Sequence, residues 1–321
     1  MNDIYNLVLS GGGFRGVAFI GVYKYLQKKK ILKNLKAISG CSAGAIFGLL
    51  INIGCNYEYL LKYIIEFNFE ELKDFNYINI LDKYGIEPGE KIINKIKDFL
   101  IEKEINPDIT FKELYELTKI KLYINTICLN DYSIIYNSVD NEPDMPVLFA
   151  VRMSISIPFI FTPILYNNRL HIDGGLIDNI PASIFNNEKK NTLILELSNF
   201  KLNNEINDFV DYSYNVILCM FYHIRDKSNN YDDFNLIKIH TKNISNLIYE
   251  LSLNNKLKLI KYGFNAAREF YKDKLFYIAP LGAQVSEGAQ VPLGAQVPEV
   301  PLGDQENEMP LGAQENNLGN I

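Results

Sequence analysis

Two short stretches near the start of the chain decide the fold: residues 4–16, IYNLVLSGGGFRG, and residues 35–44, LKAISGCSAG. Each begins with an apolar run typical of a buried strand, and each then passes through a glycine-rich turn. Helical patterns follow both turns, over residues 17–30 and from Ala43 to about Ile53. Strand, turn and helix thus occur twice in succession. This order predicts the α/β class, with a parallel sheet that carries helices on its faces.

The rest of the chain continues this mixture of helices and strands. Helical patterns cover residues 57–69, 91–102, 111–118 and 147–154. Strand patterns cover residues 122–129, 133–138, 169–172 and 192–197. Residues 207–271 are predicted to be mostly helical, with one strand near residues 236–240.

The composition changes after residue 278. The sequence Pro-Leu-Gly-Ala-Gln recurs at Pro280, Pro292 and Pro310, among small and polar residues without aromatic side chains. Such a segment cannot bury enough apolar surface to fold alone. We therefore predict a folded domain over residues 1–278 and a low-complexity, disordered tail over residues 279–321.

Charge and cysteine usage exclude several classes of protein. Six acidic residues and no basic residue follow Lys274, so this last part accounts for the whole net charge of −6. The folded part is close to neutral, which gives no electrostatic case for a nucleic-acid partner. The four cysteines form no CxxC pair and no cluster with the three histidines. We therefore expect reduced, mostly buried thiols and no structural metal site.

The first residues and one uncharged stretch indicate where in the cell the protein is expected. The first residues lack the basic segment of a secretory signal peptide. Residues 37–57 carry no charge and are about as long as a membrane span, but glycines and asparagines interrupt them. Those interruptions favour a buried strand, turn and helix. We expect an intracellular protein, soluble or peripherally associated with a membrane, without a transmembrane helix.

The strongest chemical signal is the sequence Gly40-Cys41-Ser42-Ala43-Gly44, a G-x-S-x-G pattern between a strand and a helix. A nucleophilic serine has to project from a tight turn, whose neighbouring positions need small residues. The following helix N-terminus favours negative charge that develops beside the hydroxyl. The alternative is that Ser42 serves as the N-cap of a buried helix.

A second glycine cluster contains Gly11, Gly12, Gly13, Arg15 and Gly16. It matches the G-x-G-x-x-G dinucleotide pattern, but residues 30–38 hold no acidic side chain for a ribose. Consecutive glycines can instead present backbone amides to an acyl oxygen, which forms an oxyanion hole. Arg15 either steadies this loop, attracts phosphate, or forms an ordinary surface salt bridge.

A third turn, Asp173-Gly174-Gly175, follows a predicted strand, so the carboxylate can point into a cleft or simply form a turn. A nucleophilic serine also needs a base. His171 and His240 are candidates for a serine–histidine–acid triad, but neither follows a late strand in an evident loop. Direct proton transfer from Ser42 to Asp173 remains the other possibility.

These three motifs stand in the order found in patatin-like phospholipases, which the chain resembles over about residues 5–198. Residues 150–163, AVRMSISIPFIFTP, and residues 179–181, NIP, are also similar to that family. The resemblance implies a three-layer α/β sandwich with a central mostly parallel sheet, and no metal or cofactor. It implies Ser42 as nucleophile and Asp173 as base. The supporting glycines that it implies are Gly11, Gly12, Gly13 and Gly16 with Arg15 in the oxyanion loop, and Gly40, Gly44, Gly174 and Gly175 in the two turns.

The activity implied by the resemblance is that of a phospholipase A-type lipid acyl hydrolase. It would cleave fatty-acyl esters of membrane phospholipids or other glycerolipids through an acyl-Ser42 intermediate. Residues 67–84 are rich in aromatic side chains, and they either pack as core or touch a bilayer. The alternatives are a histidine-triad esterase or acyltransferase, and a non-catalytic lipid-binding or interaction module on the same fold. Nothing in the sequence indicates an oligomeric state.

Overall fold

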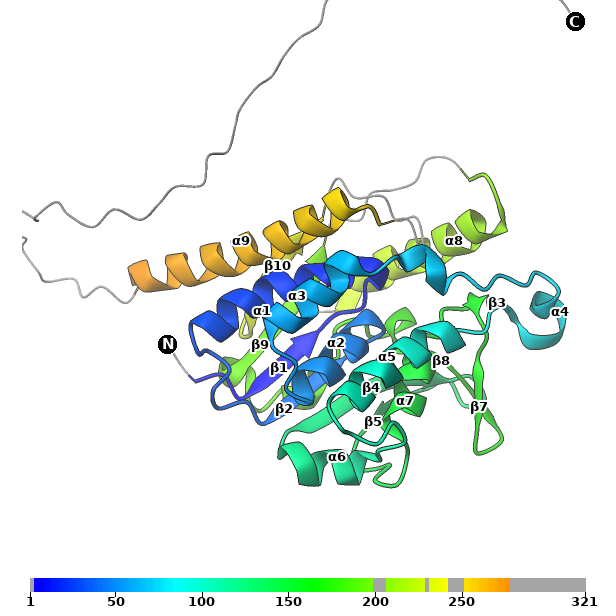
Figure 1. Ribbon diagram of the computed structural model, residues 1–321, viewed down its shortest axis with the longest axis horizontal. Coiled ribbons are helices and arrows are strands. Elements are labelled where there is room, and N and C mark those ends of the chain that lie inside the picture. The colour runs from blue at the N-terminus through cyan, green and yellow to red at the C-terminus, as the bar shows by residue number, and fades with distance from the viewer. Residues whose placement is uncertain (1–2, 199–205, 229–230, 242–250, 278–321) are drawn as a thin grey trace, which may run out of the picture. The chain divides into compact units, whose positions relative to one another are not determined.

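A mixed eight-stranded sheet forms the centre of the fold in the computed structural model (Figure 1). Its order is β10-β9-β1-β2-β4-β8-β7, and β5 pairs with β4. Strands β10, β9, β1, β2 and β4 run parallel, β5 and β8 pair antiparallel with β4, and β7 pairs antiparallel with β8. The strands are β1 Asn6–Leu9, β2 Ala37–Gly40, β4 Lys121–Cys128, β5 Ser133–Asn137, β7 Ile164–Tyr166, β8 Arg169–Asp173, β9 Thr192–Ser198 and β10 Asn235–His240, and a separate parallel pair is formed by β3 Gly85–Glu87 and β6 Phe159–Phe161.

The helices agree with the sequence pattern in most places. The predicted helices over residues 111–118 and 147–154 have the expected bounds, and the first of them begins with a capping box between Thr110 and Glu113. The helices are α1 Ala18–Lys28, α2 Ala43–Asn52, α3 Tyr57–Glu66, α4 Asn79–Lys83, α5 Glu90–Glu102, α6 Phe111–Thr118, α7 Val147–Ser154, α8 Phe209–Ser228 and α9 Leu253–Tyr277. Short 3-10 helices are η1 Gly13–Val17, η2 Phe69–Leu72, η3 Gly174–Leu176, η4 Ser183–Phe185 and η5 Lys189–Asn191.

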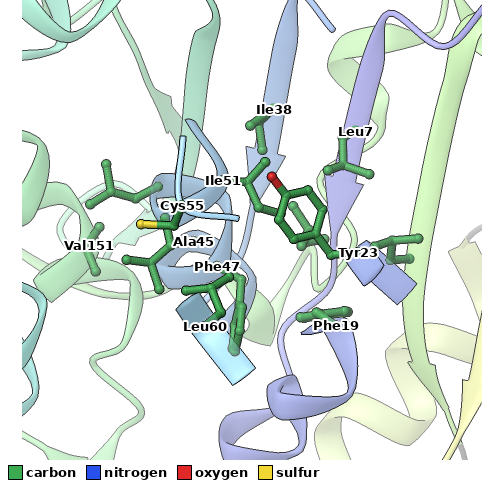
Figure 2. Close-up of a cluster of buried hydrophobic side chains, with 14 of the residues drawn as sticks. Leu7, Phe19, Tyr23, Ile38, Ala45, Phe47, Ile51, Cys55, Leu60 and Val151 are labelled. Atoms are coloured by element: carbon green, nitrogen blue, oxygen red, sulfur yellow. The ribbon is translucent and has the colours of Figure 1, made fainter. Parts of the chain in front are cut away.

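Alternate residues of the strands face two different layers, because side chains of a strand point to opposite faces of the sheet. Leu7 of β1 and Ile38 of β2 pack against the helices α1, α2 and α3, as Figure 2 shows. On the opposite face, Val8 of β1 packs in a smaller cluster with Ile180 and with Phe185 of η4. The sheet is therefore buried on both faces, as mostly parallel sheets are.

Helices α1 and α9 approach each other very closely on the first face. A Cβ atom added to Gly21 would lie 1.9 Å from the Ile260 carbonyl oxygen, and one on Gly263 would lie 1.9 Å from the Ala18 carbonyl oxygen. Two glycines, one on each helix, thus let the backbones touch. This contact fixes α9 against the N-terminal motif of the fold.

The structure describes residues 3–198, 206–228, 231–241 and 251–277. The predicted low-complexity tail, residues 279–321, lies outside the described residues. The uncharged stretch over residues 37–57 forms the buried strand β2, the turn and the buried helix α2, as expected. Among the described residues, every helix is too short or too polar to cross a membrane.

Candidate active site

Ser42 lies at the tight turn between β2 and α2. Its backbone is in a strained region with φ 52° and ψ −119°, which is rare for a residue other than glycine. Gly40 and Gly44 make this turn possible: a Cβ on Gly44 would lie 2.2 Å from the Leu9 carbonyl oxygen, and one on Gly40 would lie 2.3 Å from the Gly44 carbonyl oxygen. The Ser42 amide donates a hydrogen bond to the Ser154 hydroxyl at 2.9 Å. Neighbouring backbone and α7 therefore hold Ser42 in its strained conformation.

Strand β4 brings Asp173 to this turn, although Asp173 is far from Ser42 in the sequence. The end of β2 pairs with β4 at Gly40 and Ile124. Strand β8 pairs antiparallel with the next part of β4, so that Asp173 lies opposite Thr126. The carboxyl end of β8 thus meets the carboxyl end of β2.

The Asp173 carboxylate lies against donors from two turns. It accepts hydrogen bonds from the Gly175 amide at 2.8 Å and from the Cys41 thiol at 3.5 Å. The Ser42 hydroxyl lies close enough to act as a further donor and to lower the pKa of the carboxyl group. Sequence analysis predicted the pairing of Ser42 with Asp173, and the structure places the two side chains in contact.

Burial sets the acidity of Asp173. The side chain is 3% exposed, and loss of hydration raises the pKa of its carboxyl group from 3.8 to about 6. The hydrogen bonds from Gly175, Ser42 and Cys41 act in the opposite direction, because they stabilise the charged form. Asp173 is therefore ionised at neutral pH, but it is a stronger proton acceptor than an exposed aspartate.

The contact between Cys41 and Asp173 was not expected from the sequence. Burial raises the pKa of its thiol well above the ordinary value, and the charge of Asp173 raises it further. The thiol thus stays protonated and donates to Asp173 rather than acting as a nucleophile. The G-x-S-x-G pattern leaves this position unspecified, so nothing in the sequence signalled the contact.

The glycine loop lies beside the serine, but its amides are not equivalent. A Cβ on Gly11 would lie 3.4 Å from the Ser42 Cβ, yet the Gly11 amide already donates to the Asn179 carbonyl at 3.1 Å. The Gly12 and Gly13 amides donate no hydrogen bond to any described residue. Gly13 has φ +56°, a conformation that suits glycine. The oxyanion donors predicted from sequence are therefore reduced to Gly12 and Gly13.

The Ala43 amide is a further donor that sequence analysis did not consider. It is the first amide of α2, next to Ser42, and it makes no hydrogen bond within the described part of the chain. In hydrolases that carry a G-x-S-x-G turn, the amide that follows the nucleophilic serine contributes to the oxyanion hole.

Arg15 supports the glycine loop from inside the protein. The side chain is 4% exposed, which excludes the surface salt bridge considered from the sequence. Its Nε donates to the Gly12 carbonyl oxygen at 3.3 Å. Gly16, next in the chain, lies against α2, because a Cβ there would lie 3.1 Å from the Ala43 Cβ. This contact brings the loop close to the turn that carries Ser42.

Two asparagines support the turn after Asp173. Asn125 of β4 donates to the Asp178 carbonyl at 2.6 Å, and it lies so close to Gly174 that a Cβ there would be 2.6 Å from the Asn125 Cγ. A Cβ on Gly175 would lie 3.0 Å from the Asn179 Oδ1. The two glycines are thus required by close packing, not only by the turn.

The two described histidine side chains, those of His171 and His240, take no part in this contact. His171 is buried beside the ring of Tyr166, with 6.0 Å between ring centroids, and burial lowers its pKa. His240 Nδ1 lies 2.9 Å from the Ser198 hydroxyl. The His223 side chain lies outside the described residues. Among the described side chains, no histidine hydrogen-bonds to Ser42 or Asp173.

An apolar cavity of about 180 Å³ opens at Ser42. It follows one side of α2 and continues between α3 and α5. It is lined by Ser42 and by the α2 residues Ala43, Ile46, Phe47 and Leu50. Because an α-helix rises 1.5 Å per residue, this row extends about 12 Å from the serine. Within the described residues, no group of three or more His, Cys, Asp or Glu side chains is arranged to hold a metal ion.

Fold and site together fit an enzyme of the α/β class with a cavity that suits apolar substrates. The chain belongs to the patatin-like phospholipase family, whose model matches residues 7–186. The resemblance seen in the sequence motifs is thereby confirmed, and family membership supports an enzyme that hydrolyses lipids.

Proteins from several organisms are similar in sequence to this chain. The uncharacterized protein R571 of Acanthamoeba polyphaga mimivirus is 30% identical over 282 residues, which are 84% of this chain and 94% of R571. The probable lipid hydrolase 463L of Invertebrate iridescent virus 6 is 34% identical over 56% of this chain and 62% of its own length. The lysophospholipase NTE1 of Meyerozyma guilliermondii is 26% identical over 57% of this chain and 12% of its own length. The chain therefore spans less than two thirds of the last two relatives.

Solved structures share the fold at low sequence identity. VipD from Legionella pneumophila matches with a TM-score of 0.57 and 17% identity, over 85% of this chain and 67% of VipD. The type III effector protein ExoU matches with a TM-score of 0.50 and 14% identity, over 85% of this chain and 53% of ExoU. These likenesses confirm the predicted class, a three-layer α/β fold with a mostly parallel central sheet.

Proposed function

We propose that the protein is a phospholipase A-type lipid acyl hydrolase that cleaves fatty-acyl esters of glycerolipids, with Ser42 as nucleophile and Asp173 as base. The observation that carries this proposal is the contact between a strained serine and a buried carboxylate at the mouth of an apolar cavity. Membership in a family of phospholipases, and a relative named as a probable lipid hydrolase, support the same substrate class.

The first half of the reaction transfers the acyl group to Ser42. The Ser42 Oγ attacks the ester carbonyl while its proton passes to Asp173, and the oxyanion receives hydrogen bonds from the Gly12 and Gly13 amides. Each such donor contributes about 3 kcal/mol to the transition state. The ester C–O bond then breaks, and Asp173 returns the proton to the departing alcohol of the lysolipid.

The second half releases the fatty acid. Water attacks the acyl carbonyl, gives one proton to Asp173, and forms a second oxyanion at the same amides. When this intermediate collapses, the bond to Ser42 Oγ breaks and Asp173 gives the proton back to the serine. Asp173 ends each cycle ionised, which its pKa of about 6 permits at neutral pH.

The test of this proposal is labelling with a fluorophosphonate probe that reacts with activated serines. We expect the probe to label the wild-type chain and to fail on Ser42→Ala. Ser39→Ala is the matched control, because the Ser39 hydroxyl is also buried on β2 but makes no hydrogen bond among the described residues. The rate of labelling should fall about tenfold per pH unit below about pH 6, since protonated Asp173 is no base. Labelling that persists in Ser42→Ala would contradict the assignment.

The cavity along α2 should set the length of acyl chain that the enzyme accepts. Ile46 lies four residues after Ser42, on the row that lines the cavity. In Ile46→Phe we expect kcat/KM for long-chain esters to fall about tenfold or more, while butyrate esters, which end before this position, are little affected. Hydrolysis of a series of nitrophenyl esters measures the effect. Ile93→Phe on α5 is the control, because Ile93 is half-buried but does not line the cavity, and an equal loss at all chain lengths would refute the assignment.

A further inference from the structure

Four large apolar side chains project into solvent around helix α4. The exposed fractions are 54% for Tyr77, 73% for Ile78, 81% for Leu81 and 59% for Tyr84. None of the residues of α4 itself is buried. Figure 1 shows α4 as a cyan projection beside β3, at the edge of the sheet region. Aliphatic side chains exposed to this extent, gathered on one short segment, indicate an interaction surface.

This surface, residues 77–84, is flanked by segments that line the cavity at Ser42. The preceding residues Phe69 and Leu72 line the cavity. The following strand β3 pairs with β6 at Gly85 and Phe159. Phe159 is 47% exposed, whereas Phe161, two residues later on the same strand, lines the cavity. The lining of the cavity thus reaches both segments that flank this surface, η2 before it and β6, which pairs with β3, after it.

The charges next to this surface cancel. Lys73 and Asp74 precede it, and Asp82 and Lys83 lie within it. Two cations and two anions give no net attraction for an anionic surface. The aliphatic side chains Ile78 and Leu81 are flanked by Tyr77 and Tyr84, and tyrosine rings prefer the boundary between lipid and water.

We propose that residues 77–84, together with Phe159, dock onto the surface of a lipid bilayer and insert Ile78 and Leu81 among the acyl chains. The choice of a bilayer as occupant rests on the proposed function, because a lipid substrate has to leave a bilayer to enter the cavity, and the segments that flank this surface contribute Phe69, Leu72 and Phe161 to the cavity lining. Binding follows from apolar burial rather than from charge, so it extends to zwitterionic lipid and withstands salt.

The experiment measures co-sedimentation with phosphatidylcholine vesicles in a Ser42→Ala background, where no lipid is consumed. We expect the double change Ile78→Ser and Leu81→Ser to weaken vesicle binding about tenfold or more, since two aliphatic side chains no longer enter the membrane. The matched control changes Ile101 and Leu117 to serine, because each is 59% exposed but lies on α5 or α6. Circular dichroism checks that each variant is folded.

Three outcomes would overturn the proposal: vesicle binding that the Ile78 and Leu81 changes leave intact, binding that the control pair weakens equally, or binding that needs anionic lipid and disappears in about 0.5 M salt. A lipid-free chain whose mass in solution falls on the same double change would assign the surface to a second copy instead. Hydrolysis of a monomeric short-chain ester, measured in the wild-type background, reports on the proposed function separately. It should be unchanged by the Ile78 and Leu81 changes, because neither side chain lines the cavity.

Discussion

Replacing Asp173 by asparagine is expected to abolish turnover and to stabilise the protein at the same time. The asparagine is nearly isosteric and keeps an oxygen that can accept from the Gly175 amide, but it cannot take the Ser42 proton. Loss of a general base lowers kcat by about 10³-fold or more. Lipid mass spectrometry on mixed phospholipid vesicles measures this loss against the wild type.

The gain in stability follows from the raised pKa of Asp173. Its folded pKa of about 6 exceeds the ordinary 3.8, so the folded state binds the proton more tightly than the unfolded chain does. The wild type therefore loses stability as pH rises from about 4 to about 6, by about 3 kcal/mol in total. Asparagine has no charge to bury and does not incur this loss.

Urea unfolding at two pH values tests whether the variant is more or less stable than the wild type. At about pH 8 we expect Asp173→Asn to be more stable than the wild type by about 2 to 3 kcal/mol, and at about pH 4 we expect the two to be nearly equal. A variant that is less stable than the wild type at about pH 8 would mean that the charge of Asp173 is favourable where it lies. That result would contradict the raised pKa of Asp173.

Gly44→Ala is expected to destabilise the fold more than any other single methyl group added to α2. The new Cβ would lie 2.2 Å from the Leu9 carbonyl oxygen and 2.7 Å from that of Ser10. Both are backbone atoms of β1 and its turn, so they cannot rotate away as a side chain can. We expect a loss of about 3 kcal/mol or more in the free energy of unfolding, with loss of fluorophosphonate labelling.

Gly48→Ala on the same helix is the matched control. Its Cβ would lie 3.1 Å from the Ile38 Cγ2, which is the end of a side chain and can shift slightly. Alanine also favours the helix by about 1 kcal/mol over glycine, so the net effect should be small. Urea unfolding of both variants compares them directly. Equal losses at Gly44 and Gly48 would show that the turn tolerates a Cβ and that its tightness is not essential.

The parts of the fold that can be predicted from the sequence are those determined by residues close to one another in the chain. The turn at Ser42 needs glycines at fixed positions, and the pattern G-x-S-x-G shows them directly. Helix α6 carries its own start signal in Thr110 and Glu113, so its bounds were predicted correctly. Likewise, the uncharged stretch over residues 37–57 was correctly predicted to be a buried strand, turn and helix rather than a membrane span, because glycines interrupt it.

The features that sequence analysis missed arise from contacts between distant segments. Nothing near Asp173 in the sequence indicates that β8 runs antiparallel to β4. The loss of the Gly11 amide to Asn179 likewise depends on two loops that meet only in the folded protein. The aromatic residues over 67–84 divide into two groups, since Phe67 and Phe69 line the cavity while Tyr77 and Tyr84 are exposed. Their spacing along the chain gives no sign of this division.

The shared use of β4 by β2 and β8 has a consequence for how activity appears during folding. The two reacting side chains meet only after strands from remote parts of the chain have paired with the same central strand, and such non-local pairing is a slow event. If Asp173 accepts the Ser42 proton as proposed, a nascent or half-folded molecule carries the serine without its proton acceptor. Hydrolysis then becomes possible only after β2 and β8 have both paired with β4.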